Sequence, residues 1–308
     1  MTLDQCIKES GRRLRESNAF FGHGTLQAED DARWLVLHVA GLDDESFGMG
    51  SARDCNRLMS STELESLEQL LKRRIQDRVP AAYLVGYSWF CGLKIKLSPD
   101  VLIPRSPVSE LIESGFQPWL NPKCPVRALD LCTGSGCIAV AMASLWPHWR
   151  VDAADISSAA CAIAKSNCAA HTLGGRLEIL QGDLFAPCVN RRYDLIVANP
   201  PYVANAEYAI LPAEYEAEPV LALVAGEDGL DIVFNILLQA AQYLEPGGIL
   251  VCEVGHTDTQ LISQLPAAPF MWFDFERGGK GVFMLERDQL LELEPQVREK
   301  MRERVHVQ

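Results

Sequence analysis

The segment Asn199-Pro200-Pro201-Tyr202 combines groups that can hold a planar nitrogen in place. It follows the apolar run 195–198, and because proline cannot donate to a sheet ladder, the two prolines end the predicted strand. The Asn199 side-chain carbonyl and the Pro200 backbone carbonyl can each accept one N–H bond from an NH2 group, while Tyr202 stacks on its plane. The pattern predicts a site that aims an amide or aromatic amine nitrogen at an electrophilic methyl group. The alternative is a turn that only ends the strand.

A glycine loop, residues 130–136 with the sequence DLCTGSG, follows an earlier predicted strand and opens a helix. Gly134 and Gly136 permit a tight turn and a close approach of a ligand to the backbone. The N–H groups at the helix start suit an anionic or polar group. The string GSGCIA also fits the dinucleotide pattern G-x-G-x-x-A. The loop therefore predicts a nucleotide-like cofactor, and a glycine turn made only for packing is the alternative.

Two further predicted strands end in acidic residues. Asp155 can accept hydrogen bonds from both hydroxyls of a ribose, provided that Ser157 caps the following helix. Asp183 can reach an adenine amine, with Leu184 or Phe185 packed on the ring. Because the carboxyl ends of parallel strands meet at one edge of a sheet, these residues and the glycine loop predict a single nucleoside pocket.

Two cofactors fit such a pocket, a nicotinamide dinucleotide and S-adenosyl-L-methionine. The dinucleotide requires a second nucleotide-binding half and a hydride-transfer residue, but none of the six histidines stands at a predicted catalytic strand end. A sulfonium methyl group is already a strong electrophile, so its transfer requires no metal and no separate nucleophile. The residues therefore favour S-adenosyl-L-methionine.

The elements that must position these groups alternate between strands and helices from about residue 105 onward, which predicts an α/β fold with helices on both faces of a mostly parallel sheet. Near the end, MWFDFER and GVFMLER are separated only by GGK, so they predict a hairpin and one antiparallel strand near the sheet edge. The charged tail after Arg287 predicts a surface helix.

The first part of the chain has a different pattern. Residues 1–88 predict a small all-helical domain for substrate recognition, with a helix that stops at Gly41 and another that opens with a capping box, Ser61 or Thr62 before Glu65. Residues 89–104 predict a β-hairpin linker with strands at 93–97 and 101–103, and residues 105–308 the catalytic domain.

Length, charge and cysteine spacing exclude several classes of protein. No run among the 308 residues suits a membrane span and no signal peptide opens the chain, so we expect a cytoplasmic protein without a membrane partner. The ten cysteines form no C-x-x-C pair, which disfavours a metal site or a disulfide framework. The net charge of −13 argues against a protein that coats nucleic acid, although a local basic patch can still bind one, and it suits a basic protein partner.

Taken in order, DLCTGSG (130–136), AADIS (153–157), QGDLF (181–185) and NPPY (199–202) resemble the class I S-adenosylmethionine-dependent methyltransferases, which have a Rossmann-like sheet. With the helical N-terminal domain, the whole chain resembles the bacterial glutamine methyltransferases that modify translation proteins. This resemblance implies that Asn199 to Tyr202 hold a glutamine amide. It also implies that the cofactor is lined by Asp130, Cys132, Thr133, Gly134, Ser135, Gly136, Asp155, Asp183, Leu184 and Asn199.

The junction IPRSPVSE (103–110), preceded by WFCG (89–92), resembles the branch of this family that modifies large-subunit ribosomal protein three. The branch that modifies peptide-chain release factors typically carries Ile-Pro-Arg-Pro-Asp-Thr-Glu there. Cys132 departs from the family pattern, because many relatives have glycine at that position. A release factor, or an exocyclic amine of adenine or guanine in nucleic acid, is the alternative substrate. The acidic charge disfavours a direct nucleic-acid substrate, and the intact motifs disfavour a non-catalytic binding module.

Overall fold

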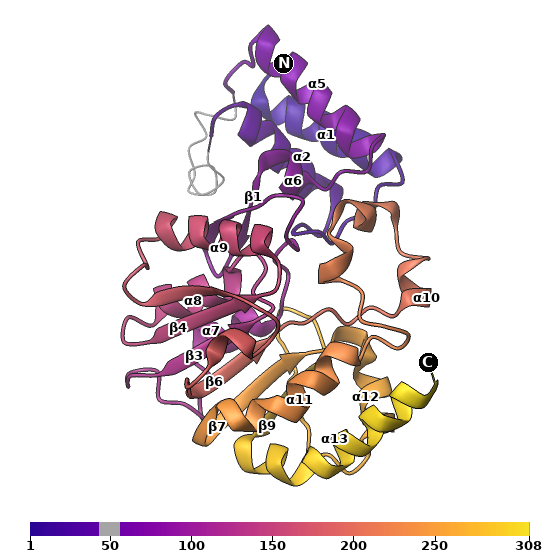
Figure 1. Cartoon of the computed structure of the whole chain (residues 1–308). Helices are drawn as coiled ribbons and strands as arrows, with labels where there is room; N and C mark the ends of the chain where they lie inside the picture. The colour runs from indigo at the N-terminus through magenta and orange to yellow at the C-terminus, as the bar shows by residue number, and fades with distance from the viewer. Residues whose placement is uncertain (43–55, 308) are drawn as a thin grey trace. The chain divides into compact units, whose positions relative to one another are not determined.

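Seven strands form the central sheet of the computed structural model, which describes residues 1–42 and 56–307. Their order is β5-β4-β3-β6-β7-β9-β8 (Figure 1). Their bounds are β3 Arg127–Leu131, β4 Arg150–Asp155, β5 Leu177–Gln181, β6 Tyr193–Ala198, β7 Leu244–Glu253, β8 Met271–Trp272 and β9 Val282–Glu286. The first five in this order run parallel, and β9 runs antiparallel to both β7 and β8. The predicted α/β fold with one antiparallel strand is confirmed.

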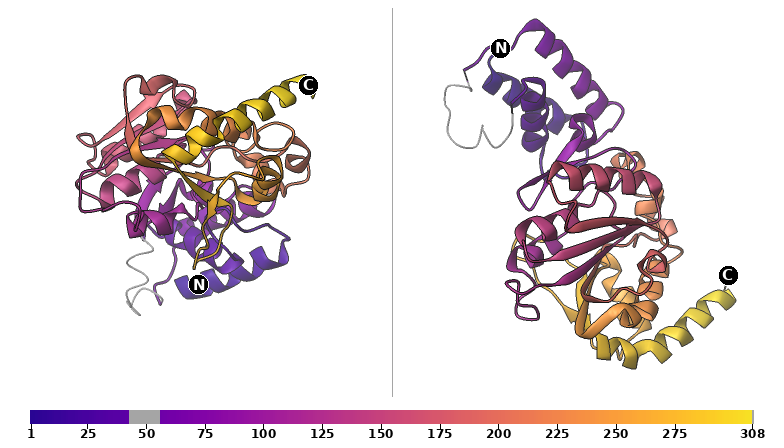
Figure 2. Two further views of the ribbon diagram at one scale, coloured as in Figure 1. Left: turned by 90° about the horizontal axis from the view of Figure 1, so that it is seen from below. Right: turned by 60° about the vertical axis from the view of Figure 1, so that its left-hand side comes forward.

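Helices cover both faces of this sheet, as the continuous apolar character of its parallel strands requires. The helices are α7 Val108–Ser114, α8 Cys137–Leu145, α9 Ser158–Ala170, α10 Asn205–Tyr208, α11 Asp231–Tyr243, α12 Asp258–Gln264 and α13 Arg287–Val307. Short 3-10 turns lie at Ala186–Cys188, Ala213–Ala217, Val220–Ala222 and Gly255–Thr257. The predicted tail helix is α13, shown in yellow, which runs along the outside of the sheet in the ribbon views (Figures 1 and 2).

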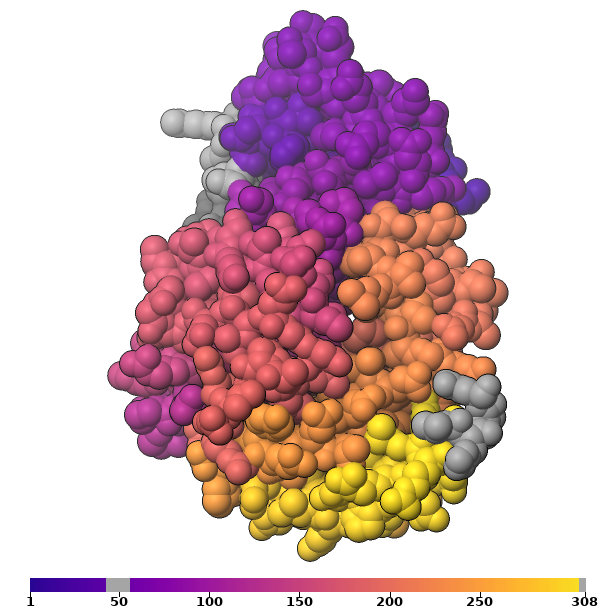
Figure 3. All heavy atoms as spheres, in the orientation of Figure 1, coloured from indigo at the N-terminus to yellow at the C-terminus, as the bar shows by residue number. Residues whose placement is uncertain are grey.

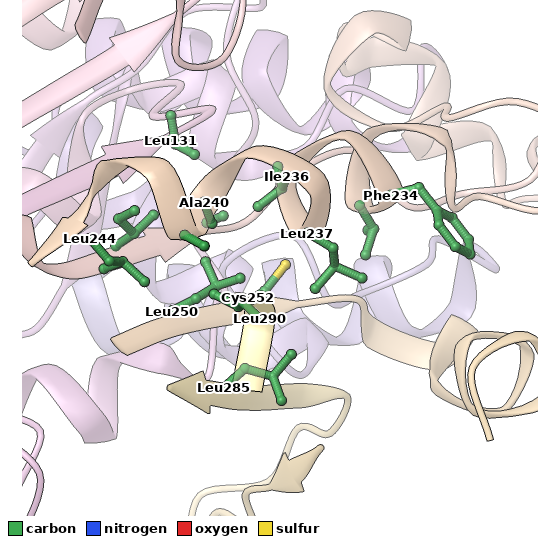
Figure 4. Packing of buried hydrophobic residues seen from close by; sticks show 14 of the residues in the cluster. Leu131, Phe234, Ile236, Leu237, Ala240, Leu244, Leu250, Cys252, Leu285 and Leu290 are labelled. Carbon is green, nitrogen blue, oxygen red and sulfur yellow. The ribbon is translucent and has the colours of Figure 1, made fainter. Parts of the chain in front are cut away.

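One large apolar cluster lies between α11, α13 and one face of the sheet. Alternate residues of the strands point into it, such as Leu250 of β7 and Leu285 of β9, and Leu237 and Ala240 of α11 meet them (Figure 4). Leu290 brings the first turn of α13 into this cluster. In the space-filling view the yellow atoms of α13 lie directly against the orange atoms of the preceding elements (Figure 3). The other face is covered separately by buried residues of α8 and α9. The core thus fixes the strands whose ends carry the predicted site.

The chain divides into two compact units, each of which is built from three separate segments of the sequence. The helical unit comprises Met1–Ser88 together with Leu97–Pro99 and Pro212–Glu218. The sheet unit comprises Trp89–Lys96, Asp100–Leu211 and Pro219–Gln308. Within the described ranges, no helix is both long enough and apolar enough to cross a bilayer.

The helical unit contains α1 (Leu3–Glu16), α2 (Ala28–Val39), α5 (Ser61–Ile75) and α6 (Ala81–Val85). The predicted stop at Gly41 agrees with the end of α2. The capping box of α5 is formed by Ser60 and Glu63, not by Ser61 or Thr62 with Glu65. Each of these serines and threonines can cap, but only Ser60 has extended backbone geometry with Glu63 at the third helical position.

The predicted hairpin forms with different strands. β1 (Tyr87–Phe90) pairs with β2 (Leu93–Lys96) around Cys91 and Gly92, which both adopt positive φ angles of 49° and 71°. A two-residue turn of this kind matches the twist of the flanking strands. Residues 101–103, the expected second strand, are not part of a strand. The alternation of apolar residues and lysines indicates the strand at 93–97, but it does not indicate the tight turn at Cys91 and Gly92 that precedes it.

A cluster of buried charges lies inside the helical unit. The Arg74 guanidinium donates to Asp31 at 2.6 Å, to Glu214 at 3.1 Å and to the Phe20 carbonyl at 2.6 Å. Glu214 also accepts the Phe20 backbone N–H at 2.9 Å, and all three charged side chains are at most 3% exposed. Burial raises the pKa of Asp31 and Arg74 opposes that rise. The cluster therefore holds residues 212–218 inside a unit otherwise built from the first hundred residues.

We predict that Arg74→Ala destabilises the helical unit by about 3–5 kcal/mol, because it leaves the buried Asp31 without its cation and Glu214 with only the more distant Arg78, at 3.6 Å. Hydrogen–deuterium exchange of peptides from α2 and α5 measures the loss. Arg13→Ala is the matched control, since Arg13 pairs with the exposed Glu68, and a change within about 1 kcal/mol is expected there. Equal effects of the two substitutions would contradict this role of the buried cluster.

Candidate active site

The Asn199-Pro200-Pro201-Tyr202 segment begins at the carboxyl end of β6, in the middle of the sheet. Ala198 lies opposite Leu131 of β3 on one side and opposite Cys252 of β7 on the other. Asn199 is therefore flanked by the first residues beyond β3 and by the end of β7. Its side chain is half-buried, and Pro200 is buried. The two prolines follow the last ladder residue, as the sequence indicated.

Tyr202 is packed between two glycines. A Cβ at Gly255 would lie 2.6 Å from the Tyr202 ring, and one at Gly229 would overlap the Tyr202 carbonyl. Both glycines also have positive φ angles, 53° and 78°, which few other residues adopt. The next residue, Val203, exchanges backbone hydrogen bonds with Leu223 and Ala225. The ring and backbone of Tyr202 are thus fixed from both sides.

Glu253, at the end of β7, is a site residue that the sequence reasoning missed. It is 5% exposed, accepts a hydrogen bond from the Tyr202 hydroxyl at 3.2 Å and another from the Ser106 hydroxyl at 2.5 Å. Burial raises the pKa of Glu253, while these two hydrogen bonds and the nearby Arg105 oppose the rise. Ser106 and Arg105 belong to the junction IPRSPVSE. Glu253 therefore links that junction to the aromatic ring of the NPPY segment.

A sequence signal for Glu253 existed. The segment GILVCEV (248–254) has the apolar pattern of a strand, and its acidic residue stands at the carboxyl end, as Asp155 does in its own strand. The predicted site draws on the ends of the first four parallel strands, so the acidic end of the fifth lies outside it. Ser106 gave no such signal, because a serine between two structural turns is common in loops.

The glycine loop between β3 and α8 turns through three residues with positive φ, namely Cys132 at 57°, Gly134 at 55° and Gly136 at 79°. Cys132 thus occupies a backbone conformation that favours glycine, which explains why the departure from the family pattern carries a steric cost. A Cβ at Gly136 would lie 3.0 Å from the Cβ of Ala164, so this glycine also allows α8 and α9 to approach.

Asp130, near the end of β3, is buried, and one of its two carboxylate oxygens accepts no hydrogen bond from the described residues. Its Oδ2 accepts the Thr133 hydroxyl at 2.5 Å and the Ala139 N–H at 3.1 Å. Its Oδ1 is buried and meets no hydrogen-bond donor among the described residues. Burial raises the pKa of Asp130 to about 7. A carboxylate in this state suits a cationic or N–H-bearing ligand group, which would satisfy the remaining oxygen. The buried Ser135 hydroxyl lies beside the Cys137 thiol.

Asp155 faces the same loop from the end of β4. Its carboxylate accepts the Gly134 N–H at 2.8 Å and the Ser157 N–H at 2.9 Å. Ser157 caps α9 by accepting the Ala160 N–H, so the prediction that Ser157 caps this helix is confirmed. Burial raises the pKa of Asp155, and its backbone hydrogen bonds oppose the rise. Lone pairs on both oxygens remain for ribose hydroxyls.

The residues after β5 divide into two groups. Asp183 is exposed and Leu184 is half-buried with a φ of 43°. Phe185, offered as an alternative to Leu184 for packing on the adenine, is fully buried and stacks on Tyr243 at 4.6 Å. Phe185 is therefore a core residue, because the turn after β5 points it into the cluster beneath α11.

Family models match both units of the chain. The model described as the methyltransferase small domain matches residues 118–213, and the model described as the PrmC N-terminal domain matches residues 14–86. The first range contains the glycine loop, Asp155, Asp183 and the NPPY segment.

Curated relatives match nearly the whole chain. A protein of Xanthomonas campestris named "Ribosomal protein uL3 glutamine methyltransferase" is 46% identical over 290 residues, which cover 94% of this chain and 92% of the relative. A protein of Xylella fastidiosa with the same name is also 46% identical, with 94% and 91% covered. The resemblance to the ribosomal-protein branch is confirmed. This chain belongs to the ribosomal protein uL3 glutamine methyltransferase family.

Proposed function

We propose that this protein transfers a methyl group from S-adenosyl-L-methionine to the side-chain amide nitrogen of a glutamine in ribosomal protein uL3, the large-subunit protein three. The observation that carries the proposal is the NPPY segment at the carboxyl end of β6, beside the glycine loop, in a chain 46% identical to proteins of that name. The acidic net charge of −13 supports a basic protein as the partner.

The residues around the glycine loop suit S-adenosyl-L-methionine. When bound, this cofactor supplies a methyl group on a positively charged sulfur. Asp130 offers a buried carboxylate with an unpartnered oxygen for the cationic amino-acid end. Asp155 offers acceptors for the ribose hydroxyls, and Asp183 with Leu184 stands at the next strand end for the adenine. The remaining residues of the loop, Cys132, Thr133, Ser135 and the two glycines, are the proposed lining between these groups.

The NPPY segment orients the acceptor. An amide nitrogen is a poor nucleophile, because its lone pair is delocalised into the carbonyl group. Hydrogen bonds from its two N–H groups to the Asn199 side chain and the Pro200 carbonyl stabilise the positive charge that develops on the nitrogen. Pro201 fixes the backbone that presents the Pro200 carbonyl. Tyr202 stacks on the amide plane, and holding the nitrogen in line contributes a large part of the acceleration.

Glu253 is a positioning residue in this scheme. It touches Tyr202 through the hydroxyl, so it sets the plane on which the amide stacks. Ser106 fixes Glu253 in turn. This chain of two hydrogen bonds gives the junction sequence a role in the geometry of the acceptor site. A single glutamine amide offers little binding energy, so contacts remote from the reacting nitrogen must supply specificity, and residues 1–88 are the proposed source of those contacts.

The substrate is tested by incubating the full chain with labelled S-adenosyl-L-methionine and, separately, purified uL3, purified release factor and ribosomal RNA. We expect uL3 to be labelled fastest, with the label on a glutamine side chain located by mass spectrometry. Faster labelling of the release factor would assign the other branch. Labelling of RNA with neither protein modified would overturn the glutamine proposal.

We predict that Asn199→Ala lowers the turnover number by about 10²-fold or more, with cofactor affinity little changed, because one preorganised acceptor is lost. Asn199→Asp retains more activity, since a carboxylate also accepts an N–H bond. Steady-state kinetics and calorimetry separate the two effects. Asn205→Ala, at an exposed asparagine that begins α10, is the matched control and keeps the normal rate. Normal turnover of Asn199→Ala would reduce the NPPY segment to a turn.

The raised pKa of Asp130 predicts a pH dependence of cofactor binding. With a pKa of about 7 in the free protein, the carboxyl group is mostly protonated at pH 6 and mostly ionised at pH 8. Affinity for the cationic cofactor therefore rises with pH, by at most about tenfold over this range. Asp130→Asn removes this part of the dependence and leaves any titration of the cofactor itself. Calorimetry at pH 6, 7 and 8 measures the cofactor affinity of the wild-type protein and of Asp130→Asn. If the affinities of the two proteins change with pH by the same factor, the role of Asp130 is contradicted.

A further inference from the structure

Two adjoining hollows lie at the amino-terminal edge of the sheet, opposite the edge that carries Asn199. Their volumes are about 530 Å³ and about 510 Å³, and Arg191 lines both. Between them they are lined by six arginines and two carboxylates, which are Arg127, Arg150, Arg176, Arg191, Arg192 and Arg287 with Asp152 and Glu178. The lining thus carries a net positive charge in a protein whose net charge is −13.

Strand direction brings these arginines together. Arg127 and Arg150 are the first residues of β3 and β4. Arg176 directly precedes β5, and Arg191 and Arg192 directly precede β6. Arg287 follows β9, whose carboxyl end reaches the same edge because this strand is antiparallel. Apart from the adjacent Arg191 and Arg192, these positions are at least 15 residues apart in sequence, so no local motif predicts this surface, which we name the arginine edge.

Most of the guanidinium groups are oriented without being neutralised. Four of them donate to backbone carbonyls, which carry no net charge: Arg150 to Gly175, Arg176 to Ala143, Arg192 to Gln242 and Arg287 to Ala241. Arg127 lies over the Tyr193 ring at 5.9 Å. Arg191 is neutralised by Asp152 and Glu178, at 2.8 and 2.9 Å, and Arg287 has Asp288 at 3.6 Å.

Oriented, uncompensated guanidinium groups are suited to phosphate, which their fork geometry matches. Gly174 and Gly175 in the first hollow have open space where a side chain would stand, so a ligand can approach the backbone there. Two hollows in succession, joined at Arg191, suit a chain of phosphates better than one anion. We propose that the arginine edge binds the phosphate backbone of RNA. The choice of RNA over other polyanions rests on the proposed function, because a ribosomal protein substrate is encountered beside ribosomal RNA.

The test measures RNA binding by the full chain separately from methylation. Fluorescence anisotropy follows a labelled 20-nucleotide RNA hairpin at 50, 100 and 200 mM salt. The variant Arg127→Ala/Arg150→Ala/Arg192→Ala removes three exposed charges of the arginine edge. The control Lys8→Ala/Arg12→Ala/Arg15→Ala removes three exposed charges of α1, each paired with a carboxylate.

For the wild-type protein we expect salt-dependent binding. The arginine-edge variant binds at least about tenfold more weakly at 50 mM salt, and its slope of log affinity against log salt is smaller by about 2 to 3. The control stays within twofold of wild type. Methylation of isolated uL3 without RNA is unchanged in the arginine-edge variant. If neither the wild-type protein nor any variant methylates uL3, the proposed function is refuted, while the RNA-binding measurements still decide the role of the arginine edge.

Three results would overturn the proposal. The first is equal RNA binding by the wild-type protein and the arginine-edge variant. The second is an equal loss in the control, which would indicate a general charge effect. The third is tighter binding of polyglutamate than of RNA, which would make the surface a site for an acidic protein. Melting curves check the fold of each protein, and the single substitution Arg150→Glu, at an exposed position, repeats the measurement if the triple variant unfolds.

Discussion

The packing of Tyr202 between Gly229 and Gly255 is the constraint on which the rest of the site depends. A side chain at either glycine would displace the ring or its backbone, so the loops after the 3-10 turn Val220–Ala222 and after β7 have to pass close to the NPPY segment. Those loops in turn carry the start of α11 and the 3-10 turn that leads to α12. The position of one aromatic ring therefore depends on the joint placement of two strand ends and the loop before α11, and the hydrogen bond from its hydroxyl to Glu253 completes that placement.

Strand direction also sorts charge across the sheet unit. Carboxylates gather at the carboxyl edge, where Asp130, Asp155 and Glu253 end three parallel strands. Arginines gather at the amino edge. Backbone N–H groups moderate the repulsion there: Ala139 in the first turn of α8 donates to Asp130, and Gly134 and the α9 cap residue Ser157 donate to Asp155. A protein with an acidic net charge can thus present two surfaces of opposite character.

How far the sequence predicts this structure depends on whether a feature is local. The parallel strands, the Ser157 cap and the antiparallel pairing of β8 with β9 follow from patterns a few residues long, and the structure confirms them. The predicted connection GGK is too short, because β8 ends at Trp272 and residues 273–281 lead to β9. Glu253, Ser106 and the core position of Phe185 depend on contacts between segments about 50 to 150 residues apart. The hairpin around Cys91 and Gly92 was misplaced because a non-glycine residue with positive φ gives no sequence signal. The roles assigned to the cofactor-lining residues stay predictions.

The ion cluster of the helical unit has a consequence for synthesis of the chain. Arg74 and Glu214 are 140 residues apart, and both lie inside the same unit. When the first 88 residues have left the ribosome, the helices can form, but the cation that Asp31 shares with Glu214 still lacks its second carboxylate. The amino-terminal unit thus reaches its final form only after β3 to β6 have been translated, although it is the first to emerge. A cut after Ser88 would separate two interlaced pieces of one unit, so the helical part is not a transplantable module.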